Sequence, residues 1–307
     1  MTNDASTRRP RAHWPYLMVL PAFALELAVH VVPLVVGVWI SLTRLTPREL
    51  RDWTAAPFTG LDNFRAWLDP DGVLAGEVVA SAGRTALYTV LVVGCSLLLG
   101  LAAALAVASA PRGRSLWQAW FAVPFALPAF VSVLSWRFIL DRDTGMMNRF
   151  LVDDLGVVGD RPFWLIGDNA FWSVVMVSVW RLWPVAFLVL AGALRSVPEE
   201  LYAAAALDGA SAWQRLRHVT LPVIRRSTVL LVLVMTLWSA TDFSTPYLLF
   251  DADPPEEATL LGNLVYRHAF VSYDLGLAAA LNVVLAVVLL VAGALAWRLT
   301  SRRPLDA

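Results

Sequence analysis

Six long apolar stretches alternate with shorter polar segments along the 307 residues of this chain. A helix needs about 20 mostly apolar residues to cross roughly 30 Å of hydrocarbon, and each stretch is long enough. The expected spans are residues 16–42, 85–109, 117–140, 171–194, 228–250 and 275–297. The apolar runs are continuous and do not alternate with a period of two, which argues against a β-barrel. The pattern therefore predicts an all-α integral membrane protein with six transmembrane helices, one transmembrane domain over residues 15–300, and short tails at 1–14 and 301–307.

Composition agrees with a membrane protein. Hydrophobic residues make up 58% of the chain and charged residues 16%, and the mean hydropathy is +0.63. These values place the chain in a lipid bilayer and not among soluble globular proteins. The apolar run after the N-terminal arginines is too long for the core of a signal peptide and lacks a small-x-small cleavage site nearby. We therefore expect it to be a retained first helix.

Charge placement predicts the orientation. Arginine supplies every basic residue, because the sequence contains no lysine. With six spans both termini fall on one side, and the segments on that side are rich in arginine, whereas the opposite loops hold most of the carboxylates. The positive-inside rule then predicts that both termini and the segment 198–222 are cytoplasmic. The formal net charge is zero, and the chain shows no concentrated basic face of the kind that binds nucleic acid.

Residues 198–222 form a short polar segment between two apolar blocks. Pro198 followed by two glutamates predicts a helix start, because proline fixes φ and the carboxylates meet the positive end of the helix dipole. Alanines continue this helix, and Gly209 then supplies a break where φ can be positive. A second, amphipathic helix is expected to run to Pro222. The segment thus predicts a helix-turn-helix hairpin beside the membrane.

This hairpin resembles the conserved cytoplasmic loop of the membrane subunits of binding-protein-dependent ABC importers. That loop carries Glu-Ala-Ala, a glycine six residues after the glutamate, and a terminal Leu-Pro. The matching positions here are Ala203-Ala204-Ala205, Gly209 and Val219-Thr220-Leu221-Pro222. One departure is Ala203, which stands where the family has glutamate, so an ionic contact of that glutamate with the ATPase is either absent or taken over by Glu199 or Glu200. An amphipathic interfacial hairpin with no partner is the alternative.

Further matches extend the resemblance to the permeases of carbohydrate importers, from about residue 16 to about residue 298. They are Gly60-Leu61-Asp62-Asn63-Phe64, Pro124-Phe125, Trp136-Arg137-Phe138, Trp164-Leu165, Val179-Trp180-Arg181, Tyr266-Arg267 and Asp274-Leu275-Gly276. Two departures stand out: residues 251–255 replace a glycine-glycine-proline turn, and Arg84-Thr85 replaces Asn-Thr. Both bear on the docking of a binding protein or on the range of substrates.

The resemblance implies a permease subunit that pairs with a second permease, a different chain, around a translocation path. It also implies two ATP-binding subunits at the hairpins, an extracytoplasmic solute-binding protein and a carbohydrate substrate. Exposed aromatic or apolar anchors suit helix-in-groove docking, and Tyr202, Leu207 and Trp213 are the anchors available. The expected ATPase-coupling residues are Glu199, Glu200, Tyr202, Ala203, Ala204, Ala205, Asp208, Gly209, Ala210, Trp213, Leu221 and Pro222.

No nucleotide or metal site is predicted in this chain. The sequence lacks a Gly-x-x-x-x-Gly-Lys-Ser/Thr loop, so we expect ATP and magnesium to be bound by the partner ATPase. The four histidines are scattered over different segments, and none has another ligand at the spacing of a metal site. The single cysteine, Cys95, excludes an intrachain disulfide. The chain is therefore expected to be a transport subunit without a cofactor, and not an enzyme.

Polar residues inside the spans indicate a substrate pathway. Ionisable groups there usually face the bundle interior or water, and Arg181 and Asp242 lie nearest mid-span, where they either pair or line the pathway. Helical spacing puts Trp238, Ser239 and Asp242 on one face, where an aromatic surface beside hydrogen-bonding groups suits a sugar ring. Maltose-type permeases place substrate contacts on the matching helices. The expected pathway residues are Ser178, Arg181, Trp238, Ser239, Asp242 and Ser244. The alternative is a lipid-facing Trp238 and serines that serve helix packing.

Other functions stay open at this point. Importers share the docking hairpin and differ in the substrate pocket, so a polyamine, glycerol phosphate or another small solute is an alternative substrate, and Asp242 suits a cation. A membrane enzyme needs paired catalytic groups at one depth, and an ion-coupled secondary transporter commonly has an internal repeat with broken helices. Neither feature is evident in the sequence, and neither class explains the hairpin.

Overall fold

The computed structural model describes residues 14–69, 72–109 and 113–301. Within them every regular element is a helix, apart from an isolated bridge between Thr43 and Phe58. The α-helices are α1 Trp14–Glu26, α2 Val32–Ser41, α3 Asp62–Arg65, α4 Val73–Ser109, α5 Arg114–Ala126, α6 Ala129–Ile139, α7 Met146–Asn148, α8 Asp168–Leu194, α9 Glu199–Leu207, α10 Ala212–Arg215, α11 Leu221–Ala240, α12 Ser244–Leu249, α13 Leu261–Tyr266 and α14 Leu275–Ser301. The prediction of an all-helical chain is confirmed for the described residues.

Five helical segments of the described chain are long and apolar enough to cross a membrane. They are Met18–Ser41, Leu74–Ser109, Asp168–Leu194, Ala212–Ala240 and Leu275–Arg298. A sixth span exists only if α5 and α6, which meet at an angle of 86°, are counted as one. The structure therefore supports a multi-pass membrane protein with five or six spans. Most of the two predicted tails lies outside the described residues.

The chain divides into two compact units. Unit 1 comprises Met1–Arg65 and His268–Val284, and unit 2 comprises Ala66–Arg267 and Leu285–Ala307. In unit 1 the Asn63 side chain donates hydrogen bonds to the carbonyls of Ser41, at 2.9 Å, and Thr43, at 2.8 Å. These carbonyls lie at and just beyond the end of α2, where backbone acceptors have no partner within the helix. The Gly-Leu-Asp-Asn-Phe segment thus closes the end of the first span.

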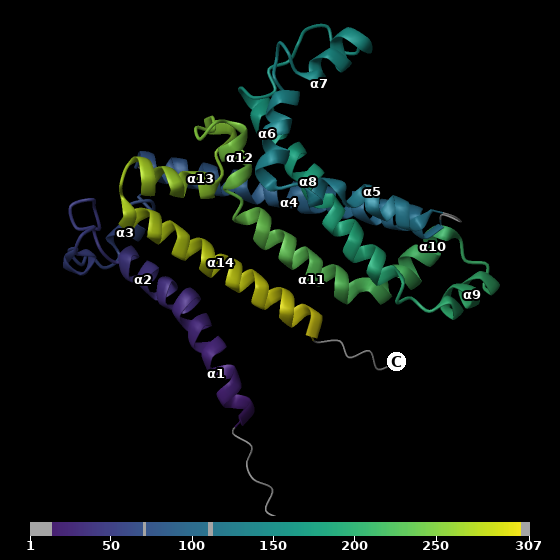
Figure 1. Ribbon diagram of the computed structural model, residues 1–307, viewed down its shortest axis with the longest axis horizontal. Helices are drawn as coiled ribbons and strands as arrows, with labels where there is room; N and C mark the ends of the chain where they lie inside the picture. The colour runs from purple at the N-terminus through teal and green to yellow at the C-terminus, as the bar shows by residue number, and fades with distance from the viewer. Residues whose placement is uncertain (1–13, 70–71, 110–112, 302–307) are drawn as a thin grey trace, which may run out of the picture. The chain divides into compact units, whose positions relative to one another are not determined.

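Unit 2 is built around α4, α8 and α11, which run side by side in Figure 1. Buried Phe187 and Leu190 of α8 pack with Ile224 and Met235 of α11 in one apolar cluster. α9 and α10 lie at the end of α11 where that helix begins, and α12 follows the other end (Figure 1). A β-carbon added to Gly100 of α4 would lie 2.6 Å from the Ala186 β-carbon, so α4 and α8 approach closely at a small residue, as membrane helices commonly do.

The second span begins earlier than predicted. α4 starts at Val73 and not at Thr85, because its first turns carry polar residues that find partners within unit 2. Glu77 accepts a hydrogen bond from Arg267 at 2.7 Å, and Arg84 donates to the carbonyl of Thr259 at 3.2 Å. The low hydropathy of these residues predicts a loop. In the folded chain their hydrogen-bond partners allow them to lie within a helix.

The third predicted span is broken. α5 ends at Ala126 and α6 begins at Ala129, and the two helices are bent by 86°. Pro128 lacks a backbone N–H and disfavours helical geometry at the preceding residue, so Leu127 is extended, with φ −75° and ψ 137°. The prediction of one continuous helix over 117–140 is wrong at this point.

The fifth predicted span, 228–250, is also corrected at both ends. The helix begins at Ala212, passes through a π-helical turn at Leu216–Thr220, and continues past Pro222 to Ala240. Pro222 does not end a helix, because it lies in the first turn of α11 after the wider π-helical turn, where a missing N–H is tolerated. Asp242 consequently lies beyond the end of α11 and not within a span.

The turn after α12 holds two non-glycine residues in the left-handed region. Asp251 has φ 58° and Ala252 has φ 72°, at the site where the resemblance expects a glycine pair. The Asp251 carboxylate lies 3.1 Å from a guanidinium nitrogen of Arg137 on α6, so this side chain has a contact that glycine would lose. Ala252 has no comparable compensation, because its amide donates to the Tyr247 carbonyl whatever the side chain is.

Ala252→Gly is expected to stabilise the protein by about 1 kcal/mol, because glycine removes the steric cost of a β-carbon at positive φ. Thermal unfolding of the purified protein in detergent measures the change. Ala258→Gly, at a buried alanine of the same loop, is the control and is expected to lower stability. An equal loss of stability in both variants would contradict the assignment of strain to Ala252.

Candidate functional site

A cavity of about 310 Å³ lies within unit 2. Its walls come from the bend between α5 and α6, from α8, and from the end of α11. The lining residues are Pro124, Phe125, Leu127, Ala129, Ser178, Arg181, Leu182, Trp238 and Asp242. The break that Pro128 imposes therefore shapes one wall of the cavity. Apolar and aromatic walls with a few convergent polar groups are typical of a small-molecule site.

A hydrogen-bonded network holds the Asp242 carboxylate. One carboxylate oxygen accepts the Tyr88 hydroxyl at 2.7 Å and the Thr245 hydroxyl at 2.6 Å, and the other accepts the Thr245 amide at 3.1 Å. The Tyr88 oxygen also lies 2.7 Å from the Ser178 hydroxyl. Since Tyr88 has one proton and gives it to the carboxylate, the Ser178 hydroxyl donates to Tyr88. The network thereby joins α4, α8 and α12 to the carboxylate of Asp242.

Arg181 joins the network through a single hydroxyl. Its Nη1 donates to the Thr245 oxygen at 2.9 Å, and Thr245 in turn donates to Asp242. The guanidinium and the carboxylate are therefore linked by Thr245, and no direct ion pair between them occurs in the described structure. Both groups line the cavity, so the arrangement presents a positive and a negative group to one space.

The structure brings together four of the six pathway residues expected from the sequence. Ser178, Arg181, Trp238 and Asp242 line the cavity. Ser239 does not: it is buried at 1% exposure, and its hydroxyl has no hydrogen-bond partner among the described residues. Ser244 is exposed and also lies outside the lining. Ser239 follows Trp238 directly within α11, and successive helical residues point about 100° apart, so its side chain faces the packed interior and not the cavity.

Sequence reasoning missed Tyr88, Thr245 and the residues of the bend. Pro128 was a readable signal for the bend, because proline and the residue before it both disfavour a helix. Tyr88 offered only a lone hydroxyl in an apolar span, and it lies 154 residues from its partner Asp242. The contact depends on the packing of α4 against α8 and α11, which hydropathy does not encode.

Tyr88→Phe is expected to lower the free energy of unfolding by about 1–3 kcal/mol, because it leaves a partly buried carboxylate without one of its donors. Tyr88 is fully buried, so water does not replace the lost hydroxyl there. Thermal unfolding in detergent measures the loss. Ser178→Ala removes a donor to Tyr88 and leaves the carboxylate contacts intact, so its expected loss is smaller. A larger loss of unfolding free energy in Ser178→Ala than in Tyr88→Phe would contradict the claim that the hydrogen bond to the Asp242 carboxylate is the more important one.

A helix-turn-helix segment occupies the end of unit 2 where α11 begins. α9 starts at Glu199, as expected, and Gly209 follows it with φ 76°. The Gly209 and Ala210 amides donate back to carbonyls of α9, at 3.1 and 2.9 Å, which is the usual way a glycine ends a helix. The Ser211 side chain and that of Gln214 then cap α10 reciprocally.

The exposed surface of this segment differs from the expected set of anchors. Leu207 is 90% exposed and Trp213 is 65% exposed. Tyr202 does not offer a free surface, because its hydroxyl lies 2.8 Å from that of buried Thr220 and its ring packs against the apolar cluster of α8 and α11. Of the other expected coupling residues, the exposed ones are Glu199, Glu200, Ala203, Ala204, Asp208, Gly209 and Pro222, and the less exposed ones are Ala205, Ala210 and Leu221.

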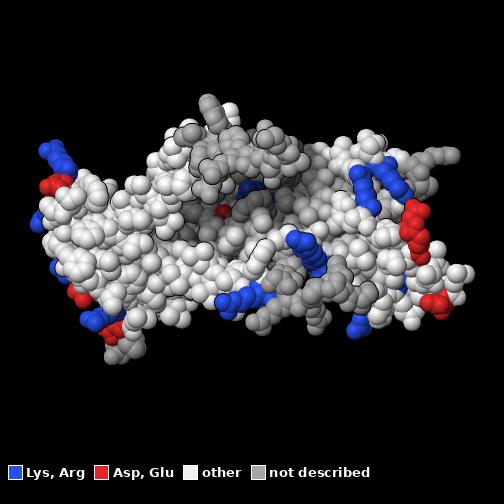
Figure 2. Space-filling model, turned by 90° about the horizontal axis from the view of Figure 1, so that it is seen from below, with Lys and Arg blue, Asp and Glu red and all other residues white. Residues whose placement is uncertain are grey.

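Charge is distributed unevenly over unit 2. In Figure 2 acidic and basic side chains gather at the end where α9 and α10 lie, whereas the flank beside the long helices carries few charges, among them basic side chains near the lower edge of the view. Glu199, Glu200, Arg217 and Arg225 are among the exposed residues at this end. A flank with few charges and an end rich in them is the distribution that a bilayer requires.

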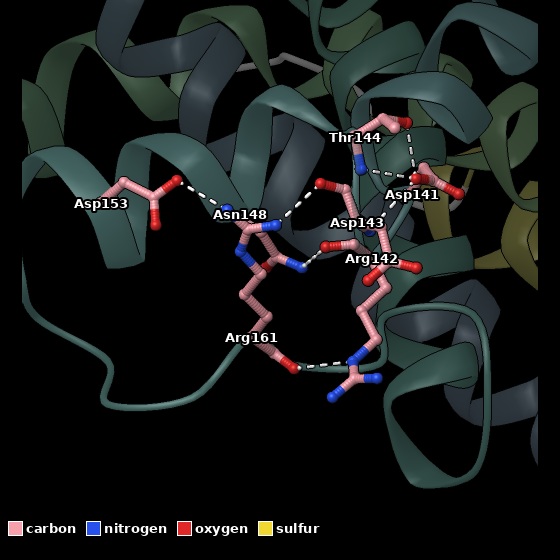
Figure 3. Close-up of polar contacts among 7 residues, drawn as sticks. All are labelled: Asp141, Arg142, Asp143, Thr144, Asn148, Asp153 and Arg161. Atoms are coloured by element: carbon pink, nitrogen blue, oxygen red, sulfur yellow. Dashed lines mark hydrogen bonds and ion pairs between the residues drawn. The ribbon is translucent and has the colours of Figure 1, made fainter.

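The segment between α6 and α8 is braced by its own polar residues. Figure 3 shows the contacts among Asp141, Arg142, Asp143, Thr144, Asn148, Asp153 and Arg161. Arg161 donates to the carbonyl of Asp143 and to the carboxylate of Asp153, each at 2.8 Å. Asp141 accepts from the Thr144 hydroxyl, at 2.6 Å, and amide, at 2.8 Å, and these bonds hold the pKa of its carboxyl below the ordinary value. The segment therefore has a fixed shape although it contains little helix.

Comparison with known proteins adds three findings. Residues 96–303 match the family described as binding-protein-dependent transport system inner membrane component. The inner membrane ABC transporter permease protein YcjO of Escherichia coli is 33% identical over 282 residues, 91% of this chain and 92% of that protein. The trehalose/maltose transport system permease protein MalF of Thermococcus litoralis is 27% identical over 277 residues, 90% of this chain and 89% of that protein.

A solved structure shares the fold. It is a bacterial ABC transporter involved in the import of the acidic polysaccharide alginate, and the matching chain has a TM-score of 0.78. The match covers 95% of this chain and 96% of that chain at 20% identity. The break between α5 and α6 and the helix-turn-helix segment before α11 thus occur in a chain that has the fold of an importer subunit.

Proposed function

Because the chain belongs to the family of binding-protein-dependent transport system inner membrane components, we propose that it is the permease subunit of an ATP-driven importer for a carbohydrate. The cavity of unit 2 is the observation that carries the substrate class. Phe125 and Trp238 offer aromatic surface, and Ser178, Arg181 and Asp242 offer hydrogen-bonding groups. A sugar ring needs both, since its C–H faces stack on aromatic rings and its hydroxyls need partners. The relative MalF, named for trehalose and maltose, supports the same class.

The proposal assigns the α9–α10 segment to the ATPase. Two ATP-binding subunits, which hold ATP and magnesium, dock there from the cytoplasm, with both chain termini on the same side. Leu207 is the main apolar anchor and Trp213 the second, because both are exposed at the hairpin. Glu199 and Glu200 lie exposed on the same short helix and take the ionic role that Ala203 cannot fill. Docking of an amphipathic helix in a groove through such anchors is a common recognition mode.

Two further partners complete the assembly. A second permease, a different chain, encloses the translocation path together with this one. A solute-binding protein delivers the carbohydrate to the opposite side of the membrane, and the self-braced segment between α6 and α8 is part of the surface it meets. The fixed shape of that segment (Figure 3) supports this role, because a preorganised surface binds a partner at a low entropic cost.

The test is transport by the reconstituted complex. The chain is co-expressed with its neighbouring ATPase and second permease, purified, and placed in liposomes with the binding protein and a panel of labelled sugars and polyamines. Sugar-stimulated ATP hydrolysis with uptake is the expected result. Failure of any ATPase to copurify, together with uptake only along an ion gradient, would overturn the proposal in favour of a secondary transporter.

A further inference from the structure

The two charged groups of the cavity differ in how much bonding capacity they have left. The Asp242 carboxylate accepts three hydrogen bonds from Tyr88 and Thr245, and a carboxylate has about four acceptor positions. The Arg181 guanidinium has five N–H groups, and one of them is bonded to Thr245. No other hydrogen bond to this guanidinium occurs in the part of the chain that the structure describes. Of the unused hydrogen-bonding positions on these two charged groups, most are therefore the N–H donors of Arg181.

Arg181 also has fewer hydrogen-bond partners than Asp242, to which it is linked through Thr245. The carboxylate has donors on both oxygens, whereas the guanidinium meets one neutral hydroxyl. The side chain is half-buried and lines the same cavity as Leu182, Phe125 and Trp238. A cation in such a place is stabilised by an anion or by several acceptors. A planar guanidinium suits the paired oxygens of a carboxylate or phosphate.

We infer that the transported saccharide carries a carboxylate or phosphate group, which Arg181 binds while the sugar ring rests on Trp238 and Phe125. This inference rests on the proposed import of a carbohydrate and names its chemical class. Arg181 is the residue that selects the charged sugar. Asp242 is not the group that selects the substrate, because Tyr88 and Thr245 take three of its about four acceptor positions, so a polyamine is not the expected substrate.

Binding to the full permease–ATPase complex without its binding protein tests the inference, because the binding protein has a selectivity of its own. Glucuronate, glucose 6-phosphate, glucose and putrescine are titrated separately by saturation-transfer NMR. The first three have the same sugar ring and differ only at C6, which carries a carboxylate, a phosphate or a hydroxyl. Their affinities therefore distinguish recognition of a carboxylate from that of a phosphate, and both from recognition of a neutral sugar. At least one of the two acids is expected to bind about tenfold tighter than glucose, the gain of one charge-assisted contact.

Arg181→Gln is expected to abolish that preference, and Arg181→Lys to reduce it severalfold, because lysine keeps the charge and loses the planar fork. Arg137→Gln is the matched control, since Arg137 pairs with Asp251 and does not line the cavity; its preference should equal that of the wild type. If Arg181→Gln does not assemble, Arg181→Lys decides, and an unchanged preference overturns the inference.

Other outcomes separate this inference from the proposed function. Equal binding of glucose and both acids, binding of putrescine alone, or an acid preference that survives in Arg181→Gln overturns the inference. Binding of none of the four compounds also overturns it for this ring. If the reconstituted complex still imports a neutral sugar, the proposed function stands and only the charged class is wrong. If it imports no sugar of any kind, the proposed function itself fails.

Discussion

Gly100→Ala is expected to destabilise the protein by about 3 kcal/mol and to disturb the contact between α4 and α8. A β-carbon at this position would lie 2.6 Å from the β-carbon of Ala186 and 2.7 Å from the backbone nitrogen of Phe187. The opposing atoms belong largely to the backbone of α8, so no rotamer change relieves the clash and the helices must separate. Thermal unfolding and size-exclusion chromatography in detergent measure the effect.

The matched control for this variant is Gly94→Ala in the same helix. A β-carbon at position 94 meets no atom within 4 Å, so the added methyl is expected to be neutral or slightly stabilising through helix propensity. A fall in stability of similar size in both variants would show that the effect comes from the helix itself and not from contact with α8.

Gly209→Pro is expected to reduce uptake more than tenfold and to abolish copurification of the ATPase, while the chain still inserts in the membrane. Gly209 has φ 76°, whereas proline is fixed near −65° and has no amide to donate to the Ala206 carbonyl. The turn between α9 and α10 cannot form, so Leu207 and Trp213 no longer present one docking surface. Uptake into liposomes and the yield of ATPase in a pull-down are the measurements.

Gly209→Asn is the control for that variant, because asparagine tolerates the left-handed region better than other side chains. It should keep most of the uptake. Normal ATPase recovery in Gly209→Pro would contradict the assignment of the hairpin to the ATPase, whereas a loss of membrane insertion in that variant would show a defect in folding and not in docking.

Hydropathy predicted the regular spans well. The expected spans 171–194 and 275–297 compare with α8 at Asp168–Leu194 and α14 at Leu275–Ser301. Such helices consist mostly of apolar residues over more than 20 positions, so length and composition are sufficient to find them. The start of α4 was missed because Glu77 and Arg84 read as loop residues, and their partners lie 190 and 175 residues away in the sequence.

In the hairpin, too, the features set by neighbouring residues were predicted, and those set by residues distant in the sequence were not. The ends of α9 and the turn at Gly209 follow from proline, glycine and capping residues within a few positions, so they were readable from the sequence. The environment of Tyr202 was not, because its partner Thr220 reaches it only when the chain returns through the π-helical turn before α11. An aromatic residue on a short helix can equally serve docking or internal packing.

The candidate site was predictable only in part. Arg181 and Asp242 were predicted because ionisable residues within the expected spans usually face the bundle interior or water, and Trp238 because helical spacing places it on the face of Asp242. The cavity itself results from two helix ends, at Ala126 and Ala240, and from contacts that join Tyr88, Ser178 and Thr245 across the fold. Proline chemistry indicated the first break. The end of α11 at Ala240 has a weaker signal: Thr241, Asp242, Ser244 and Thr245 follow it, and such side chains favour caps and turns over helix interiors.

The most direct test of the central claim, that the cavity holds the transported sugar, is protection of a single cysteine from labelling. Cys95 is the only cysteine of the chain, so Cys95→Ser provides a cysteine-free background for Leu182→Cys, which places a thiol on the cavity wall. Leu207→Cys, at an exposed position outside the cavity, is the control. The sugar that the reconstituted complex imports is expected to slow labelling of position 182 by a water-soluble thiol reagent and to leave position 207 unaffected. Labelling of position 182 at the same rate with and without that sugar would contradict the assignment of the cavity.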